Sequence, residues 1–432
     1  MHDFRYAGKK LFCENVAVES LAEKFGTPLY VYSQHTLTDH FLKLDAALAP
    51  LDHLVCFAMK ANSNLSVMRV LANLGSGFDV VSAGELQRVI AAGGDPAKCV
   101  FAGVAKSAEE IEFALRRGIY SFNCESEPEI VRINRVAAKL KKIAPIAVRV
   151  NPNIAARTHA KITTGTYENK FGIAFENIEG VYARASQLKN IRLRGLQMHI
   201  GSQLTSVTPY ELAVKKVLPL VKKLAAKYAL EFFSPGGGLG IVYNPALASG
   251  SAAWWKSAAA KGILTPASYA EKLLPLLAPL GLKILIEPGR FIVGNAGILV
   301  TRVEYVKRTG KKNFVIVDAA MNDLIRPAFY DSFHEIVPLT KKAGPTVSSD
   351  VVGGICESGD YFCKDRPLAK VGEGDRLALL SAGAYGFVMA SNYNSRPLAA
   401  EVLVSGKNVS LARKRQAVEE IWADEKVAGW LK

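Results

Sequence analysis

Cysteine is scarce in this sequence, and the spacing of the few cysteines excludes several kinds of site. The 432 residues include six cysteines, at positions 13, 56, 99, 124, 356 and 363. No two of them form a CxxC pair, which argues against a zinc ribbon or a thioredoxin-like redox site. Several lie in apolar, strand-like runs, as reduced cysteines of a protein core do. We therefore expect no metal site and a reducing, cytoplasmic environment.

Long apolar runs and a secretory leader are also missing. No run approaches the length that a membrane span needs, although half of the residues are hydrophobic. The N-terminal stretch MHDFRYAGKKLFCENV lacks the apolar core of a signal peptide. We expect a globular protein without a membrane partner, and the length favours two domains.

Acidic residues are outnumbered by basic ones, which gives a formal net charge of +15. Nucleic-acid binding would gather these cations on one face with interleaved aromatic residues. Here they are scattered in short clusters, such as 139–142, 307–312 and 413–415. A solvated basic surface is the favoured interpretation, so no nucleic-acid partner is expected. Such a surface can still attract an anionic small molecule.

Short apolar runs alternate with helix-like segments through the first two thirds of the chain. Eight predicted strands follow this rhythm, at 54–59, 78–81, 99–102, 119–122, 146–150, 196–200, 230–233 and 284–287. The alternation is typical of a (β/α)8 barrel, which makes the fold class α/β. Serine followed three residues later by glutamate marks three helix starts as capping boxes, namely Ser82 with Glu85, Ser107 with Glu110 and Ser126 with Glu129.

After residue 297 the helical rhythm stops. Val-, Ile- and Leu-rich runs at 298–306, 313–318, 351–355, 376–380 and 399–404 alternate with turn residues. This pattern predicts a mostly antiparallel β domain, a sandwich or barrel-like sheet. Two further β-like runs near the N-terminus have no place in the barrel rhythm and are expected to join it. We therefore predict a barrel domain over 34–288 and a discontinuous β domain formed by 1–33 and 289–432.

The segment 54–85 has the features of a catalytic strand end. A buried parallel strand is predicted over 54–59, and Lys60 follows at its end, before the turn residues ANSN. Barrels of this kind place their chemistry at this edge. Between apolar neighbours Lys60 is predicted to be partly desolvated, which makes its amine available for a Schiff base. On position alone, a lysine that simply reaches solvent is the plainer interpretation.

Other strand ends carry candidates that also have plain structural interpretations. Taken alone, Asp79 fits an ordinary edge carboxylate, His199 a structural histidine, and Cys356 a buried inert thiol. The glycine run SPGGGLG at 234–240 follows the seventh predicted strand. Barrels commonly bind phosphate there, because backbone N–H groups without side chains can approach an anion closely. The loop 151–172 is long and polar for a barrel connection, as functional lids are.

Together these segments resemble the pyridoxal-phosphate decarboxylases with an alanine-racemase-type barrel, the group that holds diaminopimelate, ornithine and arginine decarboxylases. The resemblance runs in family order from about residue 28 to 404. Its matches are AMKAN at 58–62, GFDVVSAGE at 77–85, VRVNP at 148–152, KFG at 170–172, HIGSQ at 199–203, the glycine run, EPGR at 287–290, MND…RP…Y at 321–330, CESGD at 356–360 and GAYG at 383–386. Gln203 favours the diaminopimelate branch over the ornithine branch, which has a small residue there.

The resemblance implies pyridoxal 5'-phosphate as the cofactor, attached to Lys60, with His199 stacked on its ring. It places Glu287 at the pyridine nitrogen, where a carboxylate keeps that nitrogen protonated and makes the ring a strong electron sink. Racemases of this fold have an arginine there instead. The implied cofactor contacts are Lys60, Asp79, Arg149, His199, Ser202, Gly237, Gly238, Glu287, Gly289, Arg290 and Tyr385.

The implied reaction is decarboxylation of meso-2,6-diaminopimelate to L-lysine and CO2, the last step of lysine biosynthesis. Cys356 is the implied proton donor, and it reaches into the partner's barrel across a homodimer interface. The catalytic set is then Lys60, Cys356, His199 and Glu287. The implied substrate contacts are Arg290, Arg326, Tyr330, Glu357 and Tyr385.

Two alternatives stay open. The first is decarboxylation of ornithine, arginine or a polyamine precursor, whose sites need not hold a distal carboxylate, so Arg290 and Arg326 argue against it. The second is a non-catalytic regulatory homologue, against which the retention of the complete catalytic set argues.

Overall fold

The structure is a computed structural model that describes residues 1–154 and 170–431. Its contacts divide the chain into two compact units. The barrel unit comprises Leu37–Ile241 and Trp255–Val293, and the β unit comprises Met1–Thr36, Val242–Trp254 and Gly294–Lys432. The segment 242–254, which the sequence-based boundaries include in the barrel, groups with the β unit. The limits at 33/34 and 288/289 stay a prediction.

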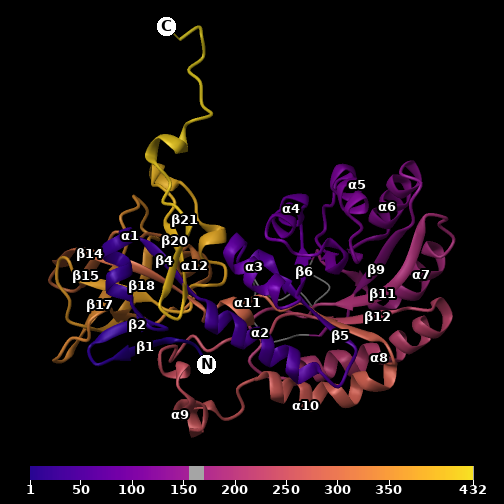
Figure 1. Cartoon of the computed structure of the whole chain (residues 1–432), viewed down its shortest axis with the longest axis horizontal. Helices are drawn as coiled ribbons and strands as arrows, with labels where there is room; N and C mark the ends of the chain where they lie inside the picture. Colours follow the sequence, from indigo (N-terminus) through magenta and orange to yellow (C-terminus); the bar gives the residue numbers. More distant parts are fainter. Residues whose placement is uncertain (155–169, 432) are drawn as a thin grey trace. The chain divides into compact units, whose positions relative to one another are not determined.

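The barrel unit is a closed parallel sheet surrounded by helices (Figure 1). Its strands lie in the order β9 (Ala144–Asn151), β11 (Ile191–Met198), β12 (Phe232–Gly236), β13 (Lys283–Ile286), β5 (His53–Ala58), β6 (Gly77–Val80), β7 (Cys99–Phe101) and β8 (Ser121–Cys124). Pairing of β8 with β9 closes the sheet, and β10 (Ile173–Ala174) pairs with the last two residues of β9. The predicted (β/α)8 barrel is confirmed.

Helices alternate with these strands as the pattern predicts. They are α2 (Gln34–Leu48), α3 (Leu65–Asn73), α4 (Ala83–Ala91), α5 (Ala108–Arg117), α6 (Glu127–Lys139), α7 (Ile178–Ala185), α8 (Thr208–Tyr228), α10 (Pro266–Leu277) and α11 (Arg290–Val293). Across the described residues, no helix is both long and apolar enough to span a membrane. Buried side chains fill the barrel interior, so polar residues find room mainly at the strand ends.

The prediction of three capping boxes is right for only one helix. At α5, the Ser107 side chain and the Glu110 carboxylate each accept a hydrogen bond from the other's backbone N–H. At α4, Ser82 caps the helix, but the carboxylate of Glu85 accepts from Val81 N instead. At α6 the carboxylate of Glu129 is likewise turned elsewhere. The serines fulfil their capping role, while tertiary partners redirect two of the glutamates.

The β unit contains a mostly antiparallel sheet, as predicted. Its main path is β18 (Tyr361–Ala369), β17 (Thr346–Val352), β15 (Asn313–Val317), β14 (Gly297–Arg308), β4 (Leu29–Ser33), β20 (Ala400–Ser405) and β21 (Asn408–Arg413). Two of its pairings, β15 with β17 and β4 with β20, are parallel. β19 (Arg376–Leu379) joins β14 and also pairs with β16 (Ile336–Pro338).

Several elements of the β unit are absent from the prediction or placed wrongly by it. The N-terminal region contains the amphipathic helix α1 (Val18–Phe25), where no helix was predicted, after the small sheet β1 (Phe4–Ala7), β2 (Lys10–Cys13) and β3 (Val16–Ala17). The predicted strand 351–355 is shifted, because the strand is Thr346–Val352. The short helices α9 (Ala252–Trp255) and α12 (Arg326–Tyr330) were also missed. Strand β18 was missed since it carries Lys, Asp, Arg and Pro in place of an apolar run.

Two nearby glycines of the barrel unit should respond oppositely to alanine. A Cβ at Gly77 would lie 2.5 Å from the backbone oxygen of Lys98 and 2.9 Å from the Cys56 sulfur, whereas one at Gly84 in α4 meets nothing closer than 3.7 Å. Gly77→Ala should destabilise the fold by about 1–3 kcal/mol through overpacking. Gly84→Ala should stabilise it by up to about 1 kcal/mol through helix propensity.

Thermal denaturation of both full-length variants beside the parent measures this difference. Equal melting temperatures for the two variants would contradict the described packing of β6.

Candidate active site at the carboxyl ends of the barrel strands

Lys60 stands at the end of β5 in a polar environment. Its Nζ lies 2.8 Å from Oδ2 of Asp79, the third residue of the neighbouring strand β6. The Lys60 side chain is 42% exposed, whereas that of Asp79 is 2% exposed. More than half of the Lys60 side chain is therefore covered, and its amine is paired with a buried carboxylate of the neighbouring strand.

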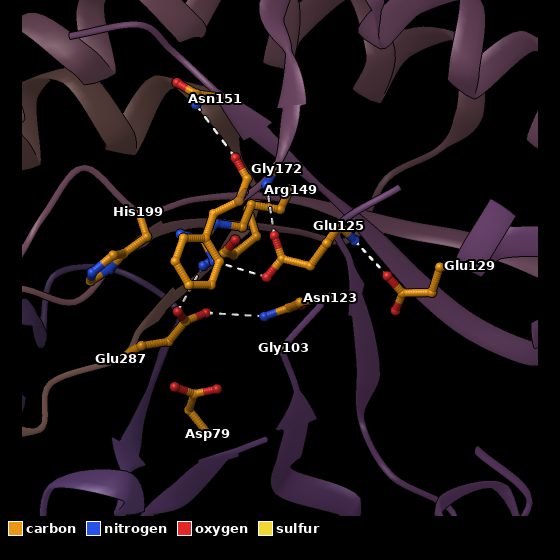
Figure 2. A network of polar contacts seen from close by, with 12 residues as sticks. Asp79, Gly103, Asn123, Glu125, Glu129, Arg149, Asn151, Gly172, His199 and Glu287 are labelled. Atoms are coloured by element: carbon orange, nitrogen blue, oxygen red, sulfur yellow. Dashed lines mark hydrogen bonds and ion pairs between the residues drawn. The ribbon is translucent and has the colours of Figure 1, made fainter. Parts of the chain in front are cut away.

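Glu287 follows β13 and lies in the barrel mouth (Figure 2). Its carboxylate accepts hydrogen bonds from Gln197 Nε2 at 2.8 Å, Ser234 Oγ at 2.9 Å and Asn123 Nδ2 at 3.3 Å. Burial, reinforced by the negative charge of Asp79, raises the pKa of Glu287 to about 7. Because this pKa is close to neutral pH, small changes in the groups around Glu287 decide whether its carboxyl group is charged.

Glu85 adds a third acid beside Lys60. Burial raises the pKa of Glu85 to about 7, and the charge of Asp79 acts in the same direction. Its carboxylate also accepts the backbone N–H of Val81 at 2.7 Å.

Among the described residues, no cluster of acidic, histidine and cysteine side chains has a metal-binding arrangement.

His199 directly follows β11, and its ring is kept neutral. Burial, together with the positive charges of Arg149 and Lys60, holds the pKa of His199 well below its usual value. Its Nδ1 accepts the backbone N–H of Gly237 at 3.3 Å, so the proton of the neutral ring belongs on Nε2. A flat, neutral ring with a fixed tautomer is suited to stacking on an aromatic ligand.

The glycine run after β12 packs directly on neighbouring backbone. A Cβ at Gly237 would collide with the backbone oxygen of Glu287, and one at Gly238 with that of Gly201. Gly238 also has a φ of 104°, which side chains disfavour. Only glycine lets this loop pack so closely on the ends of β11 and β13.

Ser202, Gly289 and Arg290 complete the predicted set in the barrel unit. Arg290 opens α11, and its Nη2 donates to Ser202 Oγ at 3.2 Å. Gly289 packs closely on β5, since a Cβ there would lie 3.0 Å from the backbone oxygen of Ala58. The arginine and the serine form a polar pair of the kind that binds anions.

Arg149 belongs to a buried ion pair rather than standing alone. Its Nη1 lies 2.8 Å from Oε1 of Glu125, and its guanidinium sits 4.8 Å from the centre of the Phe171 ring. The other oxygen of Glu125 accepts the backbone N–H of Gly172 at 2.8 Å, as Figure 2 shows. Residues 155–169 of the predicted lid lie outside the described residues.

The remaining predicted residues belong to the β unit. Arg326 and Tyr330 are in α12, Glu357 and Cys356 follow β17, and Tyr385 follows β19. Arg326 is buried and donates from Nη1 to His334 Nε2 at 3.0 Å. The thiol of Cys356 is exposed, so the plain interpretation as a buried inert cysteine is wrong.

Sequence reasoning missed four polar residues of this site: Asn123, Glu125, Gln197 and Ser234. Each is buried at or next to the carboxyl end of a barrel strand. The available signal was a polar side chain inside an apolar strand run, such as the glutamine in GLQMHI at 195–200. A polar residue in such a run must find a partner in the interior.

These residues fit pyridoxal phosphate. Lys60 offers an amine, His199 a neutral ring and Glu287 a carboxylate, and the loop from Gly236 to Gly238 packs so closely on neighbouring backbone that it admits no side chain. Within the described part of the chain, buried Oδ1 of Asp79 has no hydrogen-bond partner. An unpaired buried oxygen at the strand ends is the condition expected of a site that pairs with a ligand.

Comparisons with known proteins agree with this geometry. Residues 34–294 match the family model "Pyridoxal-dependent decarboxylase, pyridoxal binding domain". The diaminopimelate decarboxylase of Neisseria meningitidis serogroup B is 50% identical over 96% of this chain and 97% of its own length. That of Pseudomonas aeruginosa is 48% identical, covering 98% of this chain and 99% of its own.

Solved structures give the same result. Diaminopimelate decarboxylase from Helicobacter pylori, complexed with L-lysine, superposes with a TM-score of 0.87 at 40% identity and covers 94% of this chain and 98% of its own. The enzyme from M. jannaschii, also complexed with L-lysine, gives a TM-score of 0.91 at 35% identity, with full coverage of both chains. By family model, sequence and fold, this chain belongs to the pyridoxal-dependent decarboxylases, in their diaminopimelate decarboxylase branch.

Proposed function

We propose that this chain decarboxylates meso-2,6-diaminopimelate to L-lysine and CO2, with pyridoxal phosphate attached to Lys60. The observation that carries the reaction type is the buried carboxylate of Glu287 in the barrel mouth. When bound, pyridoxal phosphate supplies an electron sink for the pair left behind as CO2 departs. An acid that keeps a proton on the ring nitrogen strengthens that sink.

The chain's own residues then have distinct roles. Glu287 holds the proton at the pyridine nitrogen, and His199 supports the ring face. The phosphate group is held by Ser202, Gly237, Gly238, Gly289 and Arg290. Asp79 and Arg149 hold the charged groups around the cofactor in position. The Lys60 amine is the attachment point. Its pairing with Asp79 keeps it oriented toward the mouth.

Substrate recognition needs partners for a distal ammonium and a distal carboxylate. Arginine matches a carboxylate with paired N–H donors, and a glutamate matches an ammonium. We assign Arg290, Arg326, Tyr330, Glu357 and Tyr385 to these contacts, by resemblance. Cys356 donates the proton that replaces CO2 at Cα, so one C–C bond breaks and one C–H bond forms.

The assembly belongs to the proposal as well. We propose a homodimer in which each site takes Lys60 from one chain and Cys356 from its partner. A cytoplasmic location fits the six cysteines, none of which forms a disulfide among the described residues.

A decarboxylation assay across meso-diaminopimelate, ornithine, arginine and lysine tests the substrate. Sites built to pair with a polar group reject analogues that lack it, because their own groups are left unpaired. We expect kcat/KM for meso-diaminopimelate to exceed the others by about a hundredfold or more. Comparable turnover of ornithine would favour the alternative decarboxylase, and no turnover of any substrate the non-catalytic homologue.

Glu287→Gln should lower kcat by about a hundredfold or more while changing KM little. The amide can still hydrogen-bond the ring nitrogen but cannot keep it protonated, so the loss falls on the transition state. Glu401→Gln is the matched control, because Glu401 is an equally buried glutamate of the β unit. Steady-state kinetics at saturating cofactor measures both, and a raised KM with unchanged kcat would make Glu287 a binding residue.

Lys60→Ala and Cys356→Ala, each inactive, should regain about a quarter of the parent activity when mixed and exchanged at random, since half the dimers then carry one complete site. The Lys60→Ala protein should also lack the visible absorbance of lysine-bound cofactor.

The control is a mixture of Lys60→Ala with Glu287→Gln, in which every barrel of every mixed dimer is defective. A mixture of the first pair that exchanges subunits and stays inactive would refute the shared site.

A further inference from the structure

Three neutral side chains from three different strands converge on the Glu287 carboxylate. Gln197 of β11 donates to Oε2 at 2.8 Å, while Ser234 of β12 and Asn123 of β8 donate to Oε1 at 2.9 and 3.3 Å. All three donors are at least 98% buried. Figure 2 shows Asn123 pointing at Glu287 from β8.

The two amides leave their own oxygens unpaired in order to donate. Within the described residues, Oε1 of Gln197 and Oδ1 of Asn123 are buried and have no hydrogen-bond partner. A buried acceptor without a partner costs free energy. Turning either amide over would place its oxygen against a carboxylate oxygen, acceptor against acceptor. The carboxylate therefore selects both amide orientations.

The serine and the asparagine are themselves held in place. Ser234 Oγ accepts the backbone N–H of Gly236 at 3.1 Å, which leaves its hydroxyl proton for Glu287. The backbone oxygen of Asn123 accepts from Nζ of Lys106 at 2.9 Å, and Lys106 is buried in an ion pair with Glu129 at 2.6 Å. The donor groups are thus fixed before any ligand arrives.

The charged groups near Glu287 do not replace these donors. Asp79 on β6 and the thiol of Cys56 on β5 add no positive charge. The positive charge of Lys60 also favours the Glu287 anion, although its Nζ is bonded to Asp79. Hydrogen bonds to an ionised carboxylate favour its charged form. The three neutral donors therefore stabilise the Glu287 anion by direct hydrogen bonds, in addition to the charge of Lys60.

We propose that Gln197, Asn123 and Ser234 are positioning residues that hold the Glu287 carboxylate as an anion, in one orientation, toward the pyridine nitrogen of the cofactor. The inference rests on the proposed function, because these residues act only through Glu287. Gln197 is the strongest of the three, since it has the shortest bond and is the only donor to its oxygen among the contacts described.

Gln197→Met in the holoenzyme removes this donor at similar volume. We expect kcat to fall roughly tenfold to a hundredfold, as for loss of a hydrogen bond to a charged group, with KM changed less than about twofold. Ser234→Ala should lower kcat in the same way. Ser121→Ala is its matched control, because Ser121 is an equally buried barrel serine whose hydroxyl donates to the backbone oxygen of Phe122.

A spectroscopic titration separates positioning from a general loss of structure. Protonation of Glu287 on acidification deprives the ring nitrogen of its anionic partner and changes the absorbance of the bound cofactor. Donors lower the pKa of the carboxyl, so their removal raises it. The transition should move upward by at least about half a pH unit in Gln197→Met. It should stay in place in Ser121→Ala.

A double-mutant cycle with Glu287→Gln completes the test. If Gln197 acts through Glu287, adding Gln197→Met to Glu287→Gln should cost less than about twofold in kcat. Additive losses, or an unmoved absorbance transition with kcat equal to that of Ser121→Ala, would overturn the inference. If Glu287→Gln alone leaves kcat unchanged, the proposed role of Glu287 fails instead, so the two failures are distinguishable.

Discussion

The pairing of β8 with β9 closes the parallel sheet, and the site depends on that closure. In a closed barrel every strand presents its carboxyl end at the same rim. Residues as distant in sequence as Asn123 and Glu287 therefore meet across the mouth, although 164 positions separate them. An open sheet of the same strands would leave Asn123 on β8 at one edge and Arg149 on β9 at the other. The convergence on Glu287 described above has its origin in this topology.

Two acids in the barrel mouth, Asp79 and Glu287, have different kinds of partner. Asp79 has a lysine partner 2.8 Å away, whereas the hydrogen bonds described for Glu287 come from neutral groups. Both carboxylates are buried, and the negative charge of Asp79 raises the pKa of Glu287. The chain therefore gives Asp79 a cation in direct contact, while the described donors to Glu287 are neutral, so a ligand can bring a positive charge into contact with Glu287. A protonated ring nitrogen is a suitable source of that charge.

Most of the fold could be predicted because its signals are local. Alternating apolar runs and helix starts mark the barrel, and the strand ends named by motif carry Lys60, His199 and Glu287 where expected. The errors share a cause, which is that partners distant in sequence override local patterns. Glu129, for example, leaves its capping role to pair with Lys106. The polar sequence of β18 gives no strand signal, because the segment is held as a strand by its pairing with β17.

The β unit fixes a charged side chain in a related way. His334 is fully buried, and its Nδ1 faces the backbone oxygen of Leu380 at 2.8 Å, so Nδ1 must carry the proton. Its Nε2 then has a lone pair and accepts a hydrogen bond from Nη1 of Arg326 at 3.0 Å. The ring of Tyr243 lies 5.1 Å from the same guanidinium. A neutral imidazole and an aromatic face thus help to orient the arginine, as neutral amides help to orient Glu287. In both units, neutral side chains fix the geometry of a buried ion.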